Sequence, residues 1–312
     1  MDAITHLRAT LAPERFDKTL KWLEAPGHHV IALGDCEYPA MLREISDPPP
    51  VLYVTGRVEL LNRRSFSIVG SRNASVQGAR DAESFAHALS DAGLAVVSGM
   101  ALGIDAAAHR GGLRGQGSSV AVIGTGADRI YPPKNRDLAH ELAERGVIVS
   151  EFPVGTAPRP ENFPQRNRLI SGLSKGVLVV EAALESGSLI TARFAAEQGR
   201  DVFAIPGSIH SPMSKGCHRL IKEGAKLVDG VGDILEELGL DCAPALPARL
   251  LAETGDPILD AMGGSPVSID QLAQRTGVTA HAVASRVSLL QIEGRIASMS
   301  GGLFQRLQES IE

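Results

Sequence analysis

The sequence predicts an α/β fold: a doubly wound, mostly parallel Rossmann-like sheet with a small N-terminal helical domain and a C-terminal winged-helix domain. Short apolar runs recur between residues 65 and 230, and amphipathic stretches of helical length separate them. These runs are apolar almost throughout, which is typical of parallel strands covered on both faces. Residues 257–312 have another pattern, two helices followed by a hairpin.

Four segments follow in chain order. Residues 1–60 are predicted to form a small helical unit, which ends at the prolines of 48–50 because proline does not fit a helix interior. Residues 61–240 are predicted to form the sheet domain. Residues 241–256, rich in Pro and Ala, are a predicted linker, and 257–312 a predicted winged helix.

The apolar runs are the predicted strands of the sheet domain, with helices such as 78–92 and 138–145 between them. The runs are 65–70, 94–99, 118–124, 146–151, 176–182, 201–207 and 225–230. Ligands of such sheets bind beyond the carboxyl ends of the strands. The loops expected there are rich in Gly, Ser or Arg: 70–78, 98–105, 124–137, 152–168 and 183–189.

The C-terminal module has its own helix-capping and turn residues. A capped helix is predicted to end at Gly277, Thr279 is predicted to cap a longer helix, and a two-stranded wing is predicted to turn at Gly301-Gly302. Residues 251–312 hold four basic and seven acidic side chains, a formal charge of −3. This topology is typical of DNA-binding modules, but the charge disfavours tight phosphate binding, so a protein-interaction role is an equal alternative.

The composition and charge of the chain limit the classes of protein to which it can belong. The chain has 312 residues, 44% hydrophobic and 21% charged, and a net charge of −5, so nucleic-acid binding requires a local basic patch. Aromatic residues make up 4%, which favours phosphate contacts over stacking alone. Cys36, Cys217 and Cys242 lie far apart, and no apolar run approaches the ~20 residues of a membrane span. We expect a cytoplasmic protein without a membrane partner.

Several loops that precede predicted helices have the residues typical of anion-binding sites. Arg166 and Arg168 lie in a basic stretch predicted to be a loop that opens a helix, and Ser186-Gly187-Ser188 opens another helix. The pattern recurs at Gly70-Ser71-Arg72 and in the segment 98–103. Several such corners on one sheet suggest a polyanion and no single cofactor.

Each motif also has a structural interpretation. Arg72 binds a phosphate or is merely solvated, and Phe163 stacks a base or fills the core. Asp105 and His109 lack a third metal ligand, so we predict no metal site. Gly124-Thr125-Gly126 lacks the third glycine of a dinucleotide fingerprint, and no cofactor is predicted.

Motifs of nucleophilic or metal-dependent catalysis are absent from the sequence. Glu151 and Glu181 end strands at the expected binding edge and are either general bases or partners that orient neighbouring arginines. We therefore predict that the protein is not an enzyme.

Taken together, 68–72, 98–109, the loop from Gly124 to Asn135, 163–174, 179–195 and 204–207 resemble the DprA/Smf family (DNA-processing protein A). The order and spacing match over roughly residues 40–235. The resemblance implies a homodimer that binds single-stranded DNA and loads the RecA recombinase onto it during natural transformation. It also implies an extended Rossmann domain, a sterile-alpha-motif-like N-terminal domain and a winged helix.

Motif by motif, the resemblance places Arg72 in a Gly-Ser-Arg phosphate pocket. It places Arg159, Phe163 and the 166–168 stretch in a loop with further DNA contacts. The chain departs from the family at Gly216-Cys217-His218, where many members have a Gly-x-Asn stretch. The predicted DNA-binding residues are Gly70, Ser71, Arg72, Ser98, Gly99, Gly103, Arg159, Phe163, Arg166, Asn167, Arg168, Ser186, Gly187 and Ser188.

The main alternative is a Rossmann-like nucleotide hydrolase of the phosphoribohydrolase type. Such enzymes use a Pro-Gly-Gly loop followed by a catalytic glutamate, and this sequence has no such loop. A third interpretation, a regulator that reads double-stranded DNA through the winged module, is disfavoured by the −3 charge of that module.

Overall fold

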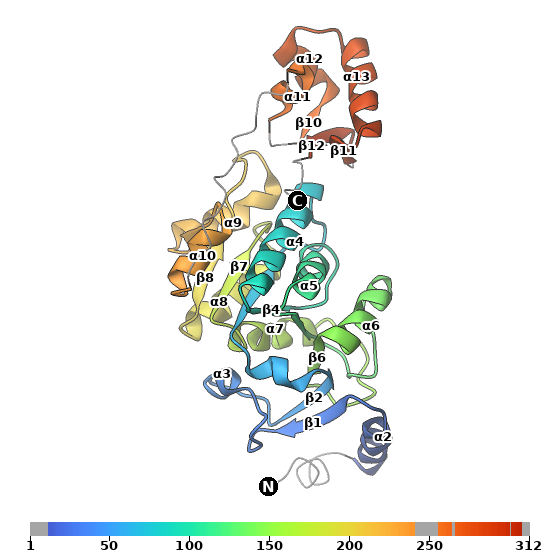
Figure 1. The fold of residues 1–312 in the computed structure, drawn as a ribbon, viewed down its shortest axis with the longest axis vertical. Coiled ribbons are helices and arrows are strands. Elements are labelled where there is room, and N and C mark those ends of the chain that lie inside the picture. Colours follow the sequence, from blue (N-terminus) through green and yellow to red (C-terminus); the bar gives the residue numbers. More distant parts are fainter. Residues whose placement is uncertain (1–11, 241–254, 264–265, 300, 308–312) are drawn as a thin grey trace. The chain divides into compact units, whose positions relative to one another are not determined.

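The computed structural model describes residues 12–240, 255–263, 266–299 and 301–307. They fall into two compact units, a large one around the main sheet and a small one near the C-terminus (Figure 1). Within these ranges, no helix combines the length and apolar character that a bilayer span requires. Cys36 is exposed and Cys217 is buried, both as free thiols, and Cys242 lies outside the described residues.

The large unit is built on a nine-stranded sheet of order β1-β2-β6-β5-β4-β3-β7-β8-β9. From β3 onward all neighbours are parallel, whereas β1–β2 and β2–β6 are antiparallel. The predicted strands of the sheet domain are confirmed. The bounds are β1 His28–Ala32, β2 Val51–Gly56, β3 Ser65–Val69, β4 Ala95–Ser98, β5 Ser119–Val122, β6 Val147–Ser150, β7 Gly176–Val179, β8 Asp201–Ala204 and β9 Lys226–Leu227.

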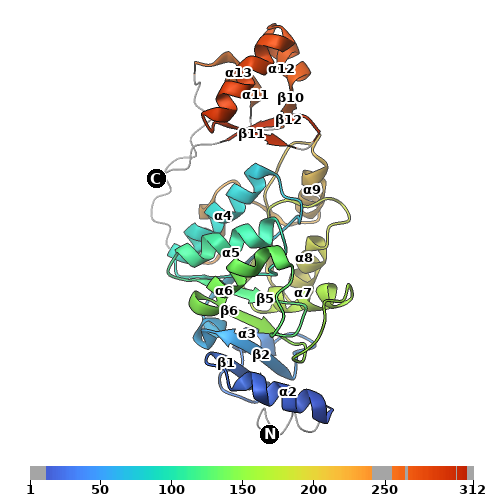
Figure 2. The same ribbon diagram turned by 90° about the vertical axis from the view of Figure 1, so that its right-hand side faces the viewer.

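Helices cover both faces of this sheet, as the continuously apolar strands require. Buried residues of α7, α8 and α9 pack on one face, and those of α4, α5, α6 and α10 on the other. Figure 2 shows α4 and α5 on one side of the strands and α7 and α8 on the opposite side. The bounds are α4 Val76–Asp91, α5 Ile104–Arg114, α6 Arg136–Arg145, α7 Asn162–Gly172, α8 Ser188–Glu197, α9 Lys215–Lys222 and α10 Val231–Glu237. The doubly wound architecture is confirmed.

The strand order reverses beside β3. From β3 the chain runs outward through β4, β5 and β6, then returns to place β7 on the other side of β3 and continues to β8 and β9. The register sets Ser67 opposite Val177 and Val69 opposite Val179. The carboxyl ends of β3 and β7 therefore diverge into loops on opposite faces, which creates the crevice where open α/β sheets bind ligands.

The predicted N-terminal segment 1–60 contains a helix, α2 (Pro13–Leu23), and a short turn of helix, α3 (Ala40–Arg43), but it is not a separate unit. Its apolar runs form β1 and β2, and β2 pairs with β6 through Tyr53 and Ser150. The boundary at residue 60 is therefore corrected. The prolines of 48–50 end no domain; they form the connection into β2, whose side chains are buried in the sheet core.

The predicted basic loop before β7 is helical instead. Helix α7 begins at Asn162, so that Phe163, Arg166 and Arg168 all lie on it. Pro164 is typical of a loop, but it lies in the first turn of α7, where a backbone N–H has no intrahelical acceptor and proline is tolerated.

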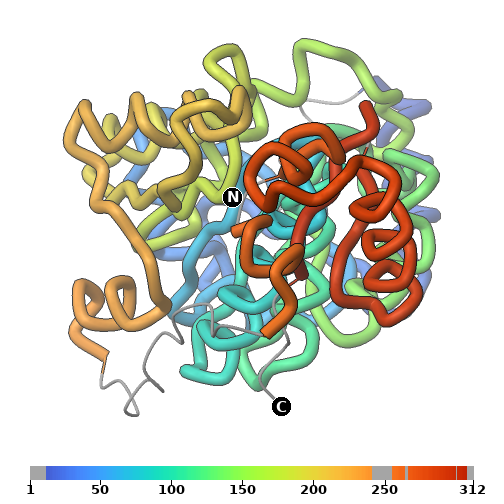
Figure 3. The backbone as a smooth tube through the Cα atoms, turned by 90° about the horizontal axis from the view of Figure 1, so that it is seen from above, coloured from blue at the N-terminus to red at the C-terminus, as the bar shows by residue number. Residues whose placement is uncertain are grey.

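The small unit is a winged helix, as predicted, and its path from orange to red can be followed in Figure 3. Ser268 and Gln271 form a reciprocal capping box on α12, which ends at Gly277 in the left-handed conformation. Thr279 occupies the N-cap of α13 without a side-chain hydrogen bond to it. Nearly all of the linker, 241–254, lies outside the described residues. The bounds are α11 Pro257–Met262, β10 Val267–Ser268, α12 Ile269–Thr276, α13 Ala280–Ile292, β11 Ile296–Met299 and β12 Leu303–Arg306.

Candidate nucleic-acid interface

A pocket of about 460 Å³ lies at the reversal point of the sheet. Its walls come from the loops after β3, β4 and β7 and from the first turns of α7 and α8. The position agrees with the rule for open α/β sheets. Of the predicted site residues, the structure brings these together in its lining: Gly70, Ser71, Arg72, Phe163, Arg166, Asn167, Ser186, Gly187 and Ser188.

The turn after β3 is packed tightly against the start of α5. A Cβ on Gly70 would lie 2.7 Å from the Ile104 side chain. The Ile104 N–H donates to the Ser71 carbonyl (3.1 Å), and the Asn73 N–H donates to Ser71 Oγ (3.0 Å). Ser71 is thereby buried, while Arg72 next to it is exposed at the mouth of the pocket.

Arg166 is the buried cation of this pocket, with 5% of its surface exposed. Its Nη2 donates to the Gly99 carbonyl (2.6 Å) and its Nη1 to Asn167 Oδ1 (2.8 Å). A Cβ on Gly99 would lie 2.1 Å from Nη1, so only glycine leaves room for the guanidinium. Arg166 Nε has no hydrogen-bond partner among the residues that the structure describes.

Arg166 and Asp105 are two buried ionisable groups that influence each other's pKa. Burial lowers the pKa of Arg166 to about 10, and the Asp105 carboxylate opposes that shift, so Arg166 is charged at neutral pH. Burial raises the pKa of Asp105, against the influence of Arg166 and of the Ala101 N–H, which donates to Oδ2 (3.3 Å). Arg166 and Asp105 therefore each favour the charged form of the other.

His109 holds the β4 loop in shape. Its Nε2 accepts a hydrogen bond from the Met100 N–H (3.2 Å), so Nδ1 carries the proton and donates to Ser119 Oγ (2.8 Å). Burial lowers the pKa of His109 to about 3, which keeps the ring neutral. Met100 has a φ of 60°, a conformation that needs such support. In the described ranges, no three His, Cys, Asp or Glu side chains are arranged to hold a metal ion.

The loop after β7 presents a helix N-terminus to the pocket. Ser186 Oγ lies 2.8 Å from Ser188 Oγ and accepts a hydrogen bond from the Ser188 N–H (3.4 Å). Asn167 Nδ2 donates to the Gly187 carbonyl (3.3 Å), which ties α7 to this loop. Gly187 is exposed and is the N-cap of α8, whose dipole places partial positive charge on the same pocket.

Phe163 forms the aromatic part of the lining. The Arg72 guanidinium lies over its ring, 5.6 Å from the centroid, and the ring of Tyr131 lies 5.5 Å away at 34°. One edge of Phe163 packs on Gly124, where a Cβ would lie 3.0 Å from Cδ1. Phe163 is half-buried and lines the pocket, so it does not simply fill the core.

Five of the predicted site residues do not line the pocket: Gly99, which contacts Arg166, and Ser98, Gly103, Arg159 and Arg168. Ser98 is buried and its Oγ donates to the Ile68 carbonyl (2.6 Å), which links β4 to β3. Gly103 has a φ of 75°, and a Cβ there would lie 2.3 Å from the Ser71 carbonyl oxygen. Arg159 is exposed on the loop before α7.

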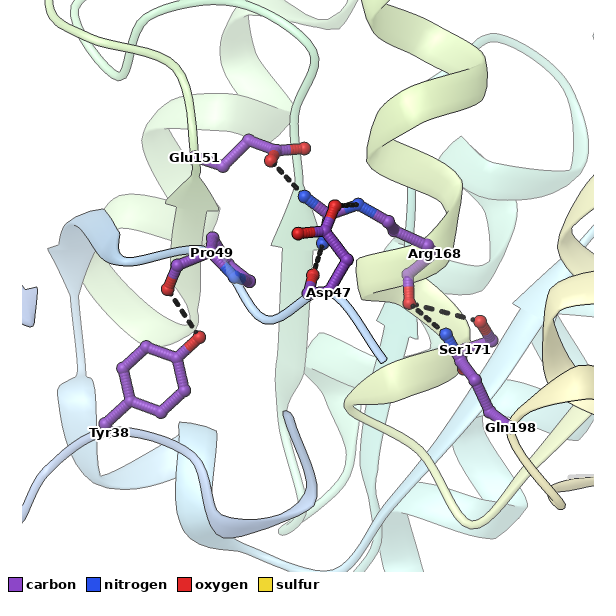
Figure 4. Close-up of polar contacts among 7 residues, drawn as sticks. All are labelled: Tyr38, Asp47, Pro49, Glu151, Arg168, Ser171 and Gln198. Atoms are coloured by element: carbon purple, nitrogen blue, oxygen red, sulfur yellow. Dashed lines mark hydrogen bonds and ion pairs between the residues drawn. The ribbon is translucent and has the colours of Figure 1, made fainter. Parts of the chain in front are cut away.

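Arg168 also lies outside the pocket lining. Its Nη2 is 2.5 Å from Glu151 Oε2, its Nη1 donates to the Asp47 carbonyl (2.6 Å), and its own carbonyl accepts from Gln198 Nε2 (3.0 Å) (Figure 4). The Arg168 side chain is 11% exposed and that of Glu151 8%. The prediction that Glu151 orients a neighbouring arginine is confirmed, and the pair joins α7 to the segment before β2.

With this geometry in place, comparison with known proteins identifies the family. A model described as DNA recombination-mediator protein A matches residues 29–239, and one described as the DprA winged helix domain matches 243–302. The chain belongs to the DprA/Smf family. The first match begins within β1, in agreement with the corrected boundary of the sheet unit.

The family includes well-covered relatives. Protein Smf of Escherichia coli (strain K12) is 43% identical over 297 residues, which cover 92% of this chain and 79% of that protein. The X-ray structure of DprA from Streptococcus pneumoniae is similar with a TM-score of 0.67 and 43% identity, covering 73% of this chain and 79% of that one. A structure of DNA processing protein A from Helicobacter pylori, described as giving insights into its single-stranded DNA binding mode, has a TM-score of 0.62 and 29% identity. It covers 67% of this chain and 95% of that one.

The DprA-family pocket also contains residues that the sequence analysis did not single out. Thr191 lies one turn into α8, and the spacing of four residues from Gly187 could have placed it on the same face of the helix end. Met213 reaches the pocket because its carbonyl accepts from the Ala182 N–H (2.7 Å). That contact joins segments on either side of β8, and no local pattern in the sequence signals it.

Proposed function

We propose that this DprA-family protein binds single-stranded DNA through backbone phosphates held in the pocket between β3 and β7. It then acts, without catalysing a reaction, as a mediator that delivers the strand to the RecA recombinase. The observation that carries the binding proposal is the lining of one pocket by the charged guanidinium of Arg166, the exposed Arg72 and the N-terminus of α8. Phosphate oxygens are suitable acceptors for guanidinium and helix N-terminal donors.

The surroundings of Arg166 suit an anion that is part of a longer chain. Arg72 at the mouth and the N-terminus of α8 add positive charge to that of Arg166, while Asp105 and Glu185 are the acids of the same lining. A few phosphate contacts fix the strand without reading its sequence, and they leave the bases free for transfer to another protein.

The preference for a single strand is supported by the small unit and by a relative. Helix α13 is the element that would enter a groove, but its Arg286 lies 2.6 Å from Asp256 and 3.5 Å from Glu293. These carboxylates cancel the charge that a duplex backbone would require. The Helicobacter pylori relative, described for its single-stranded DNA binding mode, is similar in structure over 67% of this chain.

The rival function, nucleotide hydrolysis of the phosphoribohydrolase type, uses a Pro-Gly-Gly loop followed by a catalytic glutamate, and this sequence has no such loop. Asp105 is buried and accepts from the Ala101 N–H, so it has a structural role in the β4 loop. The recombination-mediator family assignment also supports a binding role. A homodimer would present two pockets to one strand and raise the affinity through avidity.

Equilibrium binding by fluorescence anisotropy tests this function. The wild-type protein is titrated into single-stranded and double-stranded oligonucleotides of equal length at several salt concentrations. We expect tighter binding to the single strand and a linear fall of log affinity with log salt. Equal affinity for the two forms, or no binding to either, would contradict the proposal.

A further inference from the structure

Tyr131 lies beside the pocket but does not form part of its lining. Tyr131 is 44% exposed, and its ring centroid lies 5.5 Å from that of Phe163, on the side of the site formed by the loop after β5. The other two tyrosines of the chain, Tyr38 and Tyr53, are 1% and 2% exposed. Singly exposed apolar side chains are common, so exposure alone carries no function. The continuity of Tyr131 with Phe163 and Arg72 is the feature that requires explanation.

The loop that carries Tyr131 is held on both sides of it. Before Tyr131, Thr125 Oγ1 donates to the Arg129 carbonyl (3.0 Å), and Ser150 Oγ donates to the Thr125 carbonyl (2.6 Å). After it, Asn135 Nδ2 donates to the Met100 carbonyl (2.8 Å), in the same β4 loop that lies beside Arg166. The loop on both sides of Tyr131 is therefore held in place before any ligand binds, which lowers the entropic cost of using Tyr131 as a contact.

We propose that Tyr131 stacks on the base of the nucleotide next to the one whose phosphate occupies the pocket. This inference rests on the proposed function and extends it from the phosphate to the base. Arg72, Phe163 and Tyr131 form a continuous row of guanidinium and aromatic faces that leads out of the pocket. Every base has a π face, so such a contact tolerates all sequences. It also lets the protein distinguish DNA from polyanions that have no bases.

Paired oligonucleotides separate this base contact from the phosphate contacts. One is a single strand of thymidines, and the other has the same length of abasic deoxyribose phosphate. The variants are Tyr131→Ala, Tyr131→Phe, which keeps the ring, and Leu20→Ala, an exposed apolar residue of α2, as a matched control. We expect Tyr131→Ala to weaken binding to thymidines by about tenfold, within the usual range for one stacked base. Its binding to the abasic strand is expected to be unchanged, and Tyr131→Phe and Leu20→Ala are expected to match the wild type on both strands.

A second comparison excludes an indirect effect through Phe163. If Tyr131 contacts a base itself, Tyr131→Ala weakens thymidine binding further in a Phe163→Ala background. If Tyr131 only positions Phe163, it has no effect there, and the inference is overturned. An equal loss on both strands, with wild-type binding intact, overturns the inference alone. Wild-type protein that binds neither strand overturns the proposed function along with it.

Discussion

At the residue scale, the site depends on buried polar groups that fit only because a neighbouring glycine has no side chain. Gly99 admits the Arg166 guanidinium, and Gly103 admits the Ser71 carbonyl. His109 supports the loop between them by accepting the Met100 N–H with a neutral ring. A histidine held neutral makes the stability of the fold depend on pH, because the unfolded chain binds a proton that the folded chain excludes.

The sign of this dependence is set by the pKa of His109, which falls from an ordinary 6.5 to about 3 on folding. Its stabilising contribution is present above pH 6.5 and declines as the pH falls toward 3. We predict that the destabilisation caused by His109→Gln, measured by urea unfolding, is about 2 kcal/mol smaller at pH 5.0 than at pH 7.5. The wild type alone loses this contribution on acidification. A penalty that is the same at both pH values would show that His109 titrates normally in the folded state.

At the element scale, α7 connects the pocket to the core. Its first turns place Phe163 and Arg166 in the pocket, while Arg168 pairs with Glu151 and holds the segment before β2. Burial raises the pKa of Glu151, and the Arg168 charge opposes the rise. One helix thus carries a pocket-lining arginine and an ion-paired structural arginine two residues apart.

We predict that Arg168→Ala lowers the free energy of unfolding by about 3 kcal/mol, because it leaves the Glu151 carboxylate buried without its partner. The double variant Arg168→Met with Glu151→Gln is expected to recover much of that loss. DNA affinity of the folded double variant should equal that of the wild type by fluorescence anisotropy. A stable double variant with strongly reduced affinity would move Arg168 into the set of phosphate contacts.

The winged unit gives the second prediction at this scale. Because Arg286 is paired with Asp256 and Glu293, we expect deletion of residues 251–312 to leave single-strand affinity within about threefold of the wild type. Anisotropy on the same oligonucleotide measures it. A loss of more than about tenfold, ~1.4 kcal/mol, would show that the winged unit contributes to strand binding.

At the scale of the whole molecule, much of the fold could be predicted because parallel strands and helix caps have local signals. The strands from Ser65 onward and the helix end at Gly277 are of this kind. The sheet membership of β1 and β2 was missed because antiparallel pairing with a distant strand leaves no local pattern. Likewise, Arg166 and Arg168 have the same local pattern in the sequence and were both predicted to bind DNA. Only tertiary packing distinguishes Arg166, which lines the pocket, from Arg168, which is ion-paired.

A mediator must bind both the strand and its recipient, and this gives the prediction for the whole molecule. We expect the wild-type protein to accelerate RecA-dependent ATP hydrolysis on strands already covered by single-strand binding protein. We expect Arg72→Ala to remove the acceleration. Light scattering of the same samples is expected to report a homodimer. Hydrolysis that is slowed or unchanged at every ratio of proteins would leave strand binding without the mediator role.

The most direct measurement of the pocket itself is the salt dependence of single-strand affinity for the wild type and Arg72→Ala. Arg57→Ala, which removes an exposed arginine paired with Glu59, is the matched control. We predict that Arg72→Ala weakens binding by about 1.5–3 kcal/mol and reduces the slope of log affinity against log salt by about 0.7, the loss of one phosphate contact. Arg57→Ala should change neither. A folded Arg72→Ala protein with wild-type affinity and slope would contradict phosphate binding between β3 and β7.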